Sequence, residues 1–311
     1  MTKVVSLMIT KSDFYGYNLY TVTNGDMEVS FSTLGGIVTE IKFKDQTVSL
    51  GYDDVQGYMD SDEYMGAIVG RCANRTSGAA VTVNGVKYKL AANVGENMLH
   101  GGVENLPYNK RRWYAEVLGE SSVRFTMRSP HLDNGFPGNL DIFTTYTVTG
   151  NSLRIDIEAQ TDMDTYFAPA FHGYFNLDGS EKIFDHELQV NAASYVETQG
   201  EHIPTGRLLP CQSDMDFNAM RKIGHDYDKA FVLSDSHACT AKAGNIEMQL
   251  HTDFPSVQLY SGYAMSEKMG INHGFCLEPQ FYPDSANRPE FPSTLLKAGE
   301  NFHKFAEYRF F

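Results

Sequence analysis

The feature that most constrains the fold of this chain is the alternation of apolar and polar residues over short stretches. Side chains of a β-strand point alternately to opposite faces, so a period of two predicts strands with one buried face. In the first two such stretches the expected inward positions are Met27, Val29, Phe31, Ile37, Thr39, Ile41 and Phe43. No window of a dozen residues shows the 3.6-residue period of a helix. We therefore expect an all-β protein with very little helix.

Two short turn sequences indicate how neighbouring strands pair. Asn84-Gly85 separates two runs of strand-forming residues, and both turn residues tolerate the positive φ angles of a two-residue hairpin. Gly150-Asn151 occupies a similar place between two later alternating runs. Many short strands joined by such turns predict a large antiparallel β-sandwich or barrel. Since no linker-like tract interrupts the 311 residues, we expect a single domain over residues 1–311.

Composition and charge limit what the protein is expected to bind. Hydrophobic residues make up 42% of the chain, which is enough for a substantial core, and nothing in the composition indicates disorder. The formal net charge of -14 disfavours nucleic acid and anionic membranes, because the field of the protein repels polyanions. The apolar stretch at residues 4–9 is too short to span a membrane and makes a poor secretory signal.

The cysteines give no sign of a metal centre or of disulfides. All four lie far apart and form no CxxC pair: Cys72, Cys211, Cys239 and Cys276. The histidines are scattered, and the sequence motifs of nucleotide, zinc-peptidase and serine-hydrolase sites are missing. We therefore expect a cytoplasmic protein, a monomer or homodimer, without a metal.

One glutamate stands in an unusual setting for a carboxylate. Glu278 lies in the segment Leu277-Glu278-Pro279-Gln280, which continues into Phe281-Tyr282-Pro283. Burial among apolar groups raises the proton affinity of a carboxylate and makes it a candidate base. Taken alone, the segment is equally explained by a salt-bridged structural glutamate.

A histidine in a second apolar run supplies a candidate acid. His172 lies within Phe171-His172-Gly173-Tyr174-Phe175, where its imidazole has few polar neighbours in the sequence. A reaction that moves two protons needs an acid and a base in separate environments. His172 and Glu278 together therefore indicate acid–base chemistry.

Further polar candidates stand beside glycines or aromatic residues. They are Arg71, Asn74, Arg75, His100, Asp228 and Gln258. The arginines can clamp neighbouring hydroxyls or pair with surface acids, and His100 can cap its own turn. Asp228 and Gln258 have ordinary explanations as a turn acid and an outward strand residue. Aromatic faces beside such polar groups suit a sugar, whose C–H faces pack on rings while its hydroxyls meet polar atoms.

Taken together, these segments resemble the aldose 1-epimerases, also called galactose mutarotases. The resemblance spans nearly the whole chain in order and spacing. It rests on Gly66-Ala67-Ile68-Val69-Gly70-Arg71, Ala73-Asn74-Arg75, Leu99-His100-Gly101-Gly102, Gly135-Phe136-Pro137-Gly138-Asn139-Leu140, Tyr174-Phe175-Asn176-Leu177, Ile203-Pro204-Thr205-Gly206, Tyr227-Asp228, Leu277-Glu278 and Tyr308-Arg309-Phe310.

The resemblance implies a galactose mutarotase-like supersandwich that interconverts the anomers of a free aldose without metal or organic cofactor. By motif, His172 resembles the general acid of the family and Glu278 its general base. The positions that match sugar-contacting residues are Asn74, Arg75, His100, Tyr174, Asp228 and Gln258. We expect ionised Glu278 to take one proton while protonated His172 gives another, with Asp228 helping to keep the imidazole charged.

The chain departs from the family pattern at three positions, and three rival functions stay open. Phe171 and Gly173 replace the usual Asn and small hydroxyl residue around the histidine, and Pro279 replaces a threonine. The rivals are a hexose 6-phosphate epimerase, a glycosidase using Asp228 with Glu278, and a non-catalytic sugar-binding sandwich. The first would need arginines at the pocket, for which the candidates are Arg71, Arg75, Arg111 and Arg112.

Overall fold

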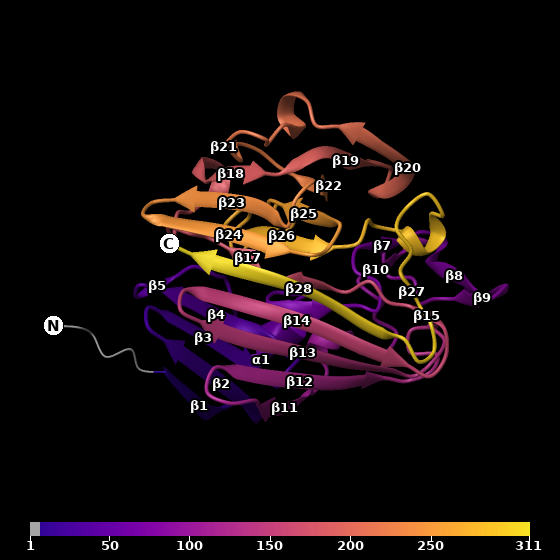
Figure 1. Cartoon of the computed structure of the whole chain (residues 1–311), viewed down its shortest axis with the longest axis horizontal. Coiled ribbons are helices and arrows are strands. Elements are labelled where there is room, and N and C mark those ends of the chain that lie inside the picture. Colours follow the sequence, from indigo (N-terminus) through magenta and orange to yellow (C-terminus); the bar gives the residue numbers. More distant parts are fainter. Residues whose placement is uncertain (1–6) are drawn as a thin grey trace.

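The computed structural model describes residues 7–311 and consists mainly of three antiparallel sheets (Figure 1). The largest has nine strands, and the C-terminal strand lies in its middle. In spatial order these are β11 (Tyr114–Val117), β12 (Ser122–Ser129), β13 (Leu140–Thr149), β14 (Ser152–Thr161), β28 (Asn301–Phe310), β24 (Ile246–Thr252), β23 (His237–Ala243), β18 (Glu187–Val190) and β21 (Arg221–Lys222). Because β28 pairs with both β14 and β24, the two halves of the chain form one continuous sheet.

A six-stranded sheet carries several of the candidate residues on neighbouring strands. Its strands, in order, are β17 (Tyr174–Phe175), β26 (Phe275–Gln280), β25 (Ser256–Tyr260), β22 (Asp228–Leu233), β19 (Ala192–Gln199) and β20 (Ile203–Pro210). Gln258 of β25 stands opposite Glu278 of β26, and Asp228 begins the next strand. The pairing therefore brings together residues that are up to 50 positions apart, from 228 to 278.

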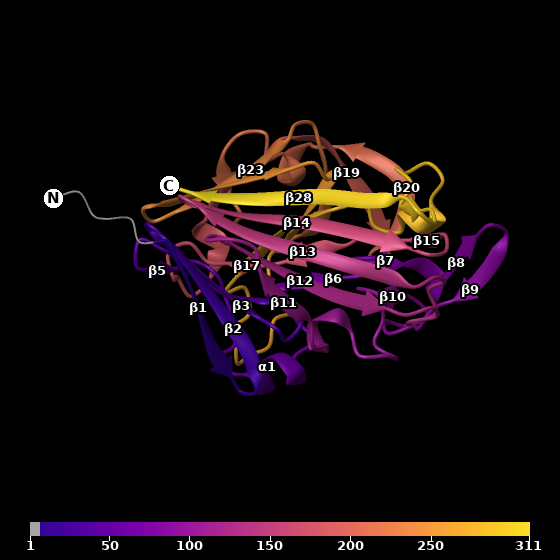
Figure 2. The ribbon, with the colours of Figure 1, turned by 60° about the horizontal axis from the view of Figure 1, so that its bottom comes forward.

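The N-terminal part forms a five-stranded sheet that descends at an angle from the long strands (Figure 2). It contains β1 (Leu7–Phe14), β2 (Tyr17–Asn24), β3 (Met27–Ser32), β4 (Val38–Phe43) and β5 (Gln46–Thr47). Four two-stranded ladders complete the sheets: β6 (Ala67–Val69) with β16 (Ala170–His172), β7 (Arg75–Thr76) with β10 (Met98–Leu99), β8 (Ala80–Val83) with β9 (Val86–Lys89), and β15 (Thr165–Tyr166) with β27 (Leu295–Leu296).

Helix is scarce in the described residues, as the sequence predicts. There is one short α-helix, α1 (Val55–Asp60), whose N-cap Asp54 accepts a hydrogen bond from the Gly57 N–H. The remaining helical turns are η1 (Ser77–Ala79), η2 (Tyr108–Lys110), η3 (Ile183–Asp185), η4 (Ser213–Met215) and η5 (Ser285–Asn287). Among residues 7–311, none of these elements has the length and apolar character of a membrane-spanning helix.

The three large sheets share one apolar core. Buried side chains from each of them belong to a single cluster, for example Val29 from β3, Leu250 from β24 and Leu277 from β26. Tyr308 of β28 crosses between layers, because its buried hydroxyl donates to the Leu277 carbonyl at 2.8 Å. The prediction of a large antiparallel β-sandwich is confirmed.

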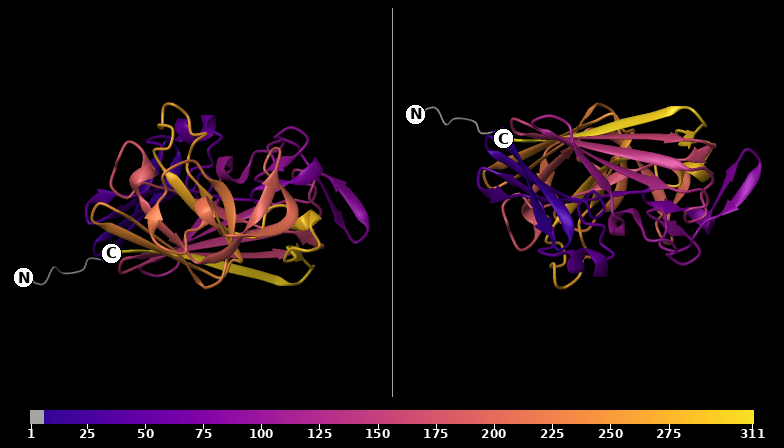
Figure 3. Two further views of the ribbon diagram at one scale, coloured as in Figure 1. Left: turned by 90° about the horizontal axis from the view of Figure 1, so that it is seen from above. Right: turned by 90° about the horizontal axis from the view of Figure 1, so that it is seen from below.

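The local turn predictions are confirmed, and one strand prediction is wrong in part. Asn84 and Gly85 have positive φ at the tip of the β8–β9 hairpin, which projects from the end of the molecule opposite the C-terminus (Figure 3). Gly150 turns the chain between β13 and β14 in the same way. Thr39 is only half-buried, because it is the extra residue of a bulge in β4: Ser30 pairs with Glu40 and Phe31 with Val38, which is buried. The apolar stretch at residues 4–9 lies partly outside the described residues.

Candidate active site

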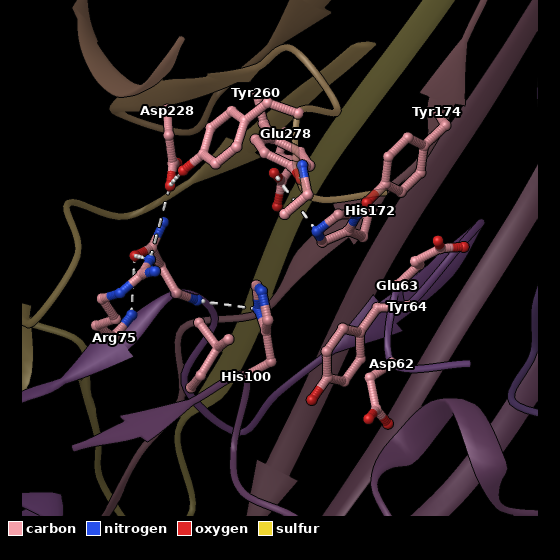
Figure 4. A pocket seen from close by; sticks show the side chains of 14 residues that line it. Asp62, Glu63, Tyr64, Arg75, His100, His172, Tyr174, Asp228, Tyr260 and Glu278 are labelled. Carbon is pink, nitrogen blue, oxygen red and sulfur yellow. Dashed lines mark hydrogen bonds and ion pairs between the residues drawn. The ribbon is translucent and has the colours of Figure 1, made fainter. Parts of the chain in front are cut away.

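A small cavity of about 190 Å³ opens beside the six-stranded sheet (Figure 4). Strands supply one side of it and the loop around β7 and β10 supplies the other. All the candidate site residues except Arg71 and Gln258 line this cavity, namely Asn74, Arg75, His100, His172, Tyr174, Asp228 and Glu278. The fold therefore gathers side chains from positions 74 to 278 around one space that is suited to a single sugar ring.

His172 and Glu278 form a buried pair that faces the cavity. His172 ends β16, Glu278 lies inside β26, and the distance from His172 Nε2 to Glu278 Oε1 is 3.7 Å. Glu278 is only 2% exposed and His172 only 5%. The second carboxyl oxygen, Glu278 Oε2, has no hydrogen-bond partner among the described residues. A buried acceptor without a partner is rare in proteins, so this oxygen is available to a ligand.

Burial sets the protonation of the pair. It raises the pKa of Glu278 well above the ordinary value, and the nearby Asp228 charge raises it further. It lowers the pKa of His172 to about 4, although Asp228 acts in the opposite direction. The structure therefore favours a carboxyl and a neutral imidazole, whereas the sequence led us to expect a carboxylate and an imidazolium. Both arrangements hold one proton between the two residues, so they differ only by a proton transfer within the pair.

Asp228 is, in contrast, surrounded by partners. It accepts hydrogen bonds from the Gln258 amide and, at 3.3 Å, from the Tyr263 hydroxyl. Arg75 Nη1 lies 4.0 Å from the carboxylate and His202 Nδ1 lies 3.5 Å from it. Gln258 in turn accepts a 3.1 Å hydrogen bond from Gln280. Gln258 is thus placed behind Asp228, where it orients the carboxylate instead of lining the cavity.

The loop opposite the sheet holds Asn74, Arg75 and His100 in a defined arrangement. The Asn74 N–H donates to His100 Nδ1 at 3.2 Å, and the Asn74 side-chain oxygen accepts from the Arg75 N–H at 2.9 Å. Asn74 and His100 both have positive φ, and burial lowers the pKa of His100 well below its ordinary value. Since Nδ1 accepts a hydrogen bond, the proton of the neutral imidazole resides on Nε2, which makes His100 a donor toward a ligand.

His100 lines the cavity, and its ring accepts from the Asn74 N–H, 26 positions away, instead of capping its own turn. Asp284 supports the same loop, because its N–H donates to the Arg75 carbonyl at 3.0 Å. Arg75 Nε is buried without a hydrogen-bond partner in the described part of the chain. The guanidinium therefore offers an unused donor in the same cavity as the free oxygen of Glu278.

Arg71, only four residues from Arg75, has a purely structural position. It is 1% exposed and does not line the cavity. Its guanidinium donates to the carbonyls of Ser129, Pro130, Pro137 and Gly138. Both alternatives considered for Arg71, a clamp on neighbouring hydroxyls and a pairing with surface acids, are wrong. The guanidinium is buried and holds the 129–138 loop through these four carbonyls.

Several lining residues were missed by the sequence analysis. Tyr64 packs on His100 with ring centroids 4.7 Å apart, and it covers His172 at 6.2 Å. Glu63 lines the cavity and joins two loops, since it accepts from the Ser266 N–H at 2.6 Å and from the Tyr52 hydroxyl. Their only signal in the sequence is the position immediately before the Gly66–Arg71 motif.

The departures from the family pattern have a steric explanation. A Cβ added at Gly173 would lie 2.4 Å from Phe171 Cε1, so the aromatic ring fills the space of a side chain at position 173. Phe171 also packs edge-on against Tyr308, with centroids 5.7 Å apart. Phe171 and Gly173 are therefore one coupled change. Pro279 is accommodated because β17, as described, pairs only with Phe275 and Cys276 of β26.

Comparisons with known proteins agree with this arrangement. The model of the aldose 1-epimerase family matches residues 18–309. The chain is 33% identical to a galactose mutarotase of Bos taurus, with 94% of this chain and 93% of that protein aligned. It is 32% identical to an aldose 1-epimerase of Haemophilus influenzae, over 94% and 96% of the two chains. The solved structure of the GalM/aldose epimerase homologue from C. elegans superposes with a TM-score of 0.89 at 25% identity, covering 98% and 99%. The chain therefore belongs to the aldose 1-epimerase family.

Proposed function

We propose that this protein interconverts the α and β anomers of a free aldose such as glucose or galactose. The observation that carries the proposal is the buried His172–Glu278 pair, with its facing atoms 3.7 Å apart at the wall of a sugar-sized cavity. Mutarotation moves protons at two oxygens bonded to the same carbon, the anomeric hydroxyl and the ring oxygen. A base and an acid that serve both must therefore lie close together, as these two side chains do.

The reaction needs one proton removed and one delivered. In the form of the pair that holds its proton on His172, Glu278 takes the proton of the anomeric hydroxyl and His172 protonates the ring oxygen. The C1–O5 bond breaks, C1 becomes an aldehyde, and rotation about C1–C2 presents its other face. Ring closure reverses both proton transfers, so the pair returns to its starting state with one proton. Burial is useful because water does not compete for these protons.

The remaining residues are proposed to hold the sugar. Arg75 Nε and the Nε2–H of His100 are donors, and Glu278 Oε2 is an acceptor. Asp228 is held by Gln258 and can accept a sugar hydroxyl with its remaining lone pairs. Tyr174 and Asn74 complete the polar wall.

The rival functions are less well supported. Of the four arginines considered for a phosphate, Arg75 lines the cavity, Arg71 holds a loop, Arg111 pairs with Asp133 at 2.6 Å, and Arg112 packs on the ring of Tyr17. Asp228, the second carboxylate required for a glycosidase, is already engaged by several donors. A sugar-binding protein without turnover has no need for a buried acid–base pair.

The wider setting of the protein is also a proposal. The four cysteines are free in the described chain, which suits a reducing compartment such as the cytoplasm. The net charge of -14 argues against nucleic acid and anionic membrane surfaces as partners. The shared apolar core of the three sheets supports a single domain, which we propose to work as a monomer or homodimer without a cofactor.

Polarimetry of freshly dissolved α-D-glucose and α-D-galactose tests the function. The protein is expected to accelerate the approach to the equilibrium rotation, and both Glu278→Gln and His172→Asn are expected to abolish most of the acceleration. Two control variants make the same chemical changes away from the cavity. They are Glu300→Gln, in the turn before β28, and His303→Asn, on the exposed end of β28. Wild-type rates in both site variants would contradict the proposal.

A further inference from the structure

A third chemically reactive group lies directly behind the acid–base pair. Cys276 and Glu278 are two residues apart on β26, so their side chains point to the same face of the strand. Cys276 Sγ lies 3.7 Å from His172 Nδ1. One ligand atom from each of His172, Cys276 and Glu278 falls within 4.8 Å of the other two. The proposed reaction has no use for the thiol.

The three donor atoms match the preferences of one class of cation. A nitrogen, a sulfur and a carboxylate oxygen suit Zn²⁺ and similar borderline-soft divalent ions, whereas Mg²⁺ and Ca²⁺ prefer oxygen alone. With ordinary zinc bond lengths and tetrahedral angles, two ligand atoms of one ion lie about 3.5 Å apart. An imidazole binds one ion through one nitrogen, so the two 3.7 Å distances, from Nε2 to Glu278 and from Nδ1 to Cys276, belong to alternative ligand sets. One nitrogen, the sulfur and a carboxylate oxygen lie within 4.8 Å of one another, so side-chain rotations must close up to about 1.3 Å to reach the tetrahedral spacing.

The carboxylate also has unused bonding capacity. Glu278 Oε2 is buried and has no hydrogen-bond partner among the described residues. His172 and Glu278 line the cavity, from which an ion can reach them, whereas Cys276 is fully buried behind them. Three protein ligands leave the fourth position of a tetrahedral ion for water.

We propose that His172, Cys276 and Glu278 form a binding site for a zinc-class divalent cation, and that occupancy of this site inhibits the enzyme. The site itself follows from the geometry of the three side chains. Its inhibitory effect depends on the proposed function, because the bound ion occupies the lone pairs that His172 and Glu278 need for proton transfer.

Binding of the ion displaces protons. The Cys276 thiol binds as a thiolate and releases its proton to solvent, and a neutral Glu278 carboxyl likewise loses its proton.

Cobalt(II) added to the purified full-length chain provides a test that does not depend on activity. The wild type is expected to bind one ion with a thiolate-to-cobalt charge-transfer band in the near ultraviolet, and Zn²⁺ is expected to displace it. Cys276→Ala should lose the band and weaken zinc binding in calorimetry by about tenfold or more, since even outer-shell partners of a metal contribute that much. Cys211→Ala, which removes a half-buried thiol elsewhere, should leave both unchanged.

Mutarotation supplies the second readout. Zn²⁺ is expected to inhibit the wild type, a saturating aldose should raise the concentration needed, and Cys276→Ala should resist inhibition relative to its own metal-free rate. Mg²⁺ should have no effect. A cobalt spectrum or a zinc inhibition curve that is the same in Cys276→Ala as in the wild type would overturn the site. A charge-transfer band in a protein without mutarotase activity would uphold the site and refute the proposed function instead.

Discussion

Two carboxylates of the same sheet, Glu278 and Asp228, lie in opposite kinds of environment. Glu278 is buried, has one oxygen without a partner, and its pKa is raised well above the ordinary value. Asp228 is held by Gln258, Tyr263 and Arg75. A carboxyl with an unpartnered oxygen can exchange protons, whereas a carboxylate held by several donors is better suited to positioning other groups. The two environments therefore support our proposal that Glu278 reacts and that Asp228 binds the sugar.

The largest expected effect is the loss of proton transfer when Glu278 becomes glutamine. Glu278→Gln keeps the shape of the side chain but cannot act as a base, so kcat should fall by roughly 10²–10⁴-fold. Polarimetric progress curves measured over a range of sugar concentrations separate kcat from KM. If kcat were preserved while KM rose, Glu278 would be a binding residue like Asp228, and the contrast between them would disappear.

A smaller effect, of a different kind, is expected at Asp228. Asp228→Asn removes a charged acceptor from the sugar and the ionic partner of Arg75, and a hydrogen bond to a charged group contributes about 1.5–3 kcal/mol. KM should therefore rise by about tenfold to a hundredfold while kcat changes less. Asp141→Asn on the partly exposed edge of β13 is a matched control. A decrease in kcat as large as that of Glu278→Gln would show that both carboxylates take part in the chemistry.

Phe171 and Gly173 flank His172, so substitutions at these two positions perturb His172 and leave Asp228 unchanged. Gly173→Ser forces a side chain into the Phe171 ring, and such overpacking costs about 1–3 kcal/mol of stability. The displaced strand should also lower kcat, because His172 lies between the two positions. The double variant Phe171→Asn with Gly173→Ser should recover part of both losses. Urea unfolding and initial rates of the two single variants, Phe171→Asn and Gly173→Ser, and of the double variant measure this, and purely additive effects would rule out the coupling.

The smallest expected effect is a gain in stability that depends on pH. The pKa of Glu278 is raised in the folded state from an ordinary value of 4.5, so folding retains a proton that the unfolded chain releases above pH 4.5. The wild type therefore loses stability relative to a non-titrating glutamine as the pH rises from 4.5 toward the folded pKa. Glu278→Gln should be more stable than the wild type by about 1–3 kcal/mol at pH 7 and by much less at pH 5.

Urea midpoints at the two pH values measure this gain. Asp228→Asn provides the contrast, since it leaves Arg75 without its ionic partner and is expected to lower stability at pH 7. A glutamine variant that is less stable than the wild type at pH 7 would mean that Glu278 is ionised in the folded protein.

The sequence could predict most of the fold and the membership of the site because these depend on local patterns. Alternation predicted the strands, Asn84-Gly85 and Gly150-Asn151 predicted two hairpins, and family motifs pointed to the residues around the cavity. The failures have physical reasons. Thr39 was assigned to the core because the sequence pattern does not reveal the bulge at this position. Arg71 was grouped with Arg75 because both stand in one motif, although Arg71 is buried.

The sequence by itself determined the alternation, the turns and the presence of an imidazole and a carboxyl in apolar segments. Only the tertiary structure decided that β16 and β26 bring them to 3.7 Å, that Gln258 supports Asp228, and that Cys276 lies behind His172. Burial in the tertiary structure also raises the pKa of Glu278 and lowers that of His172. The physical reason is that strand pairing and turn chemistry act between near neighbours, whereas burial and charge depend on residues brought together from distant parts of the chain.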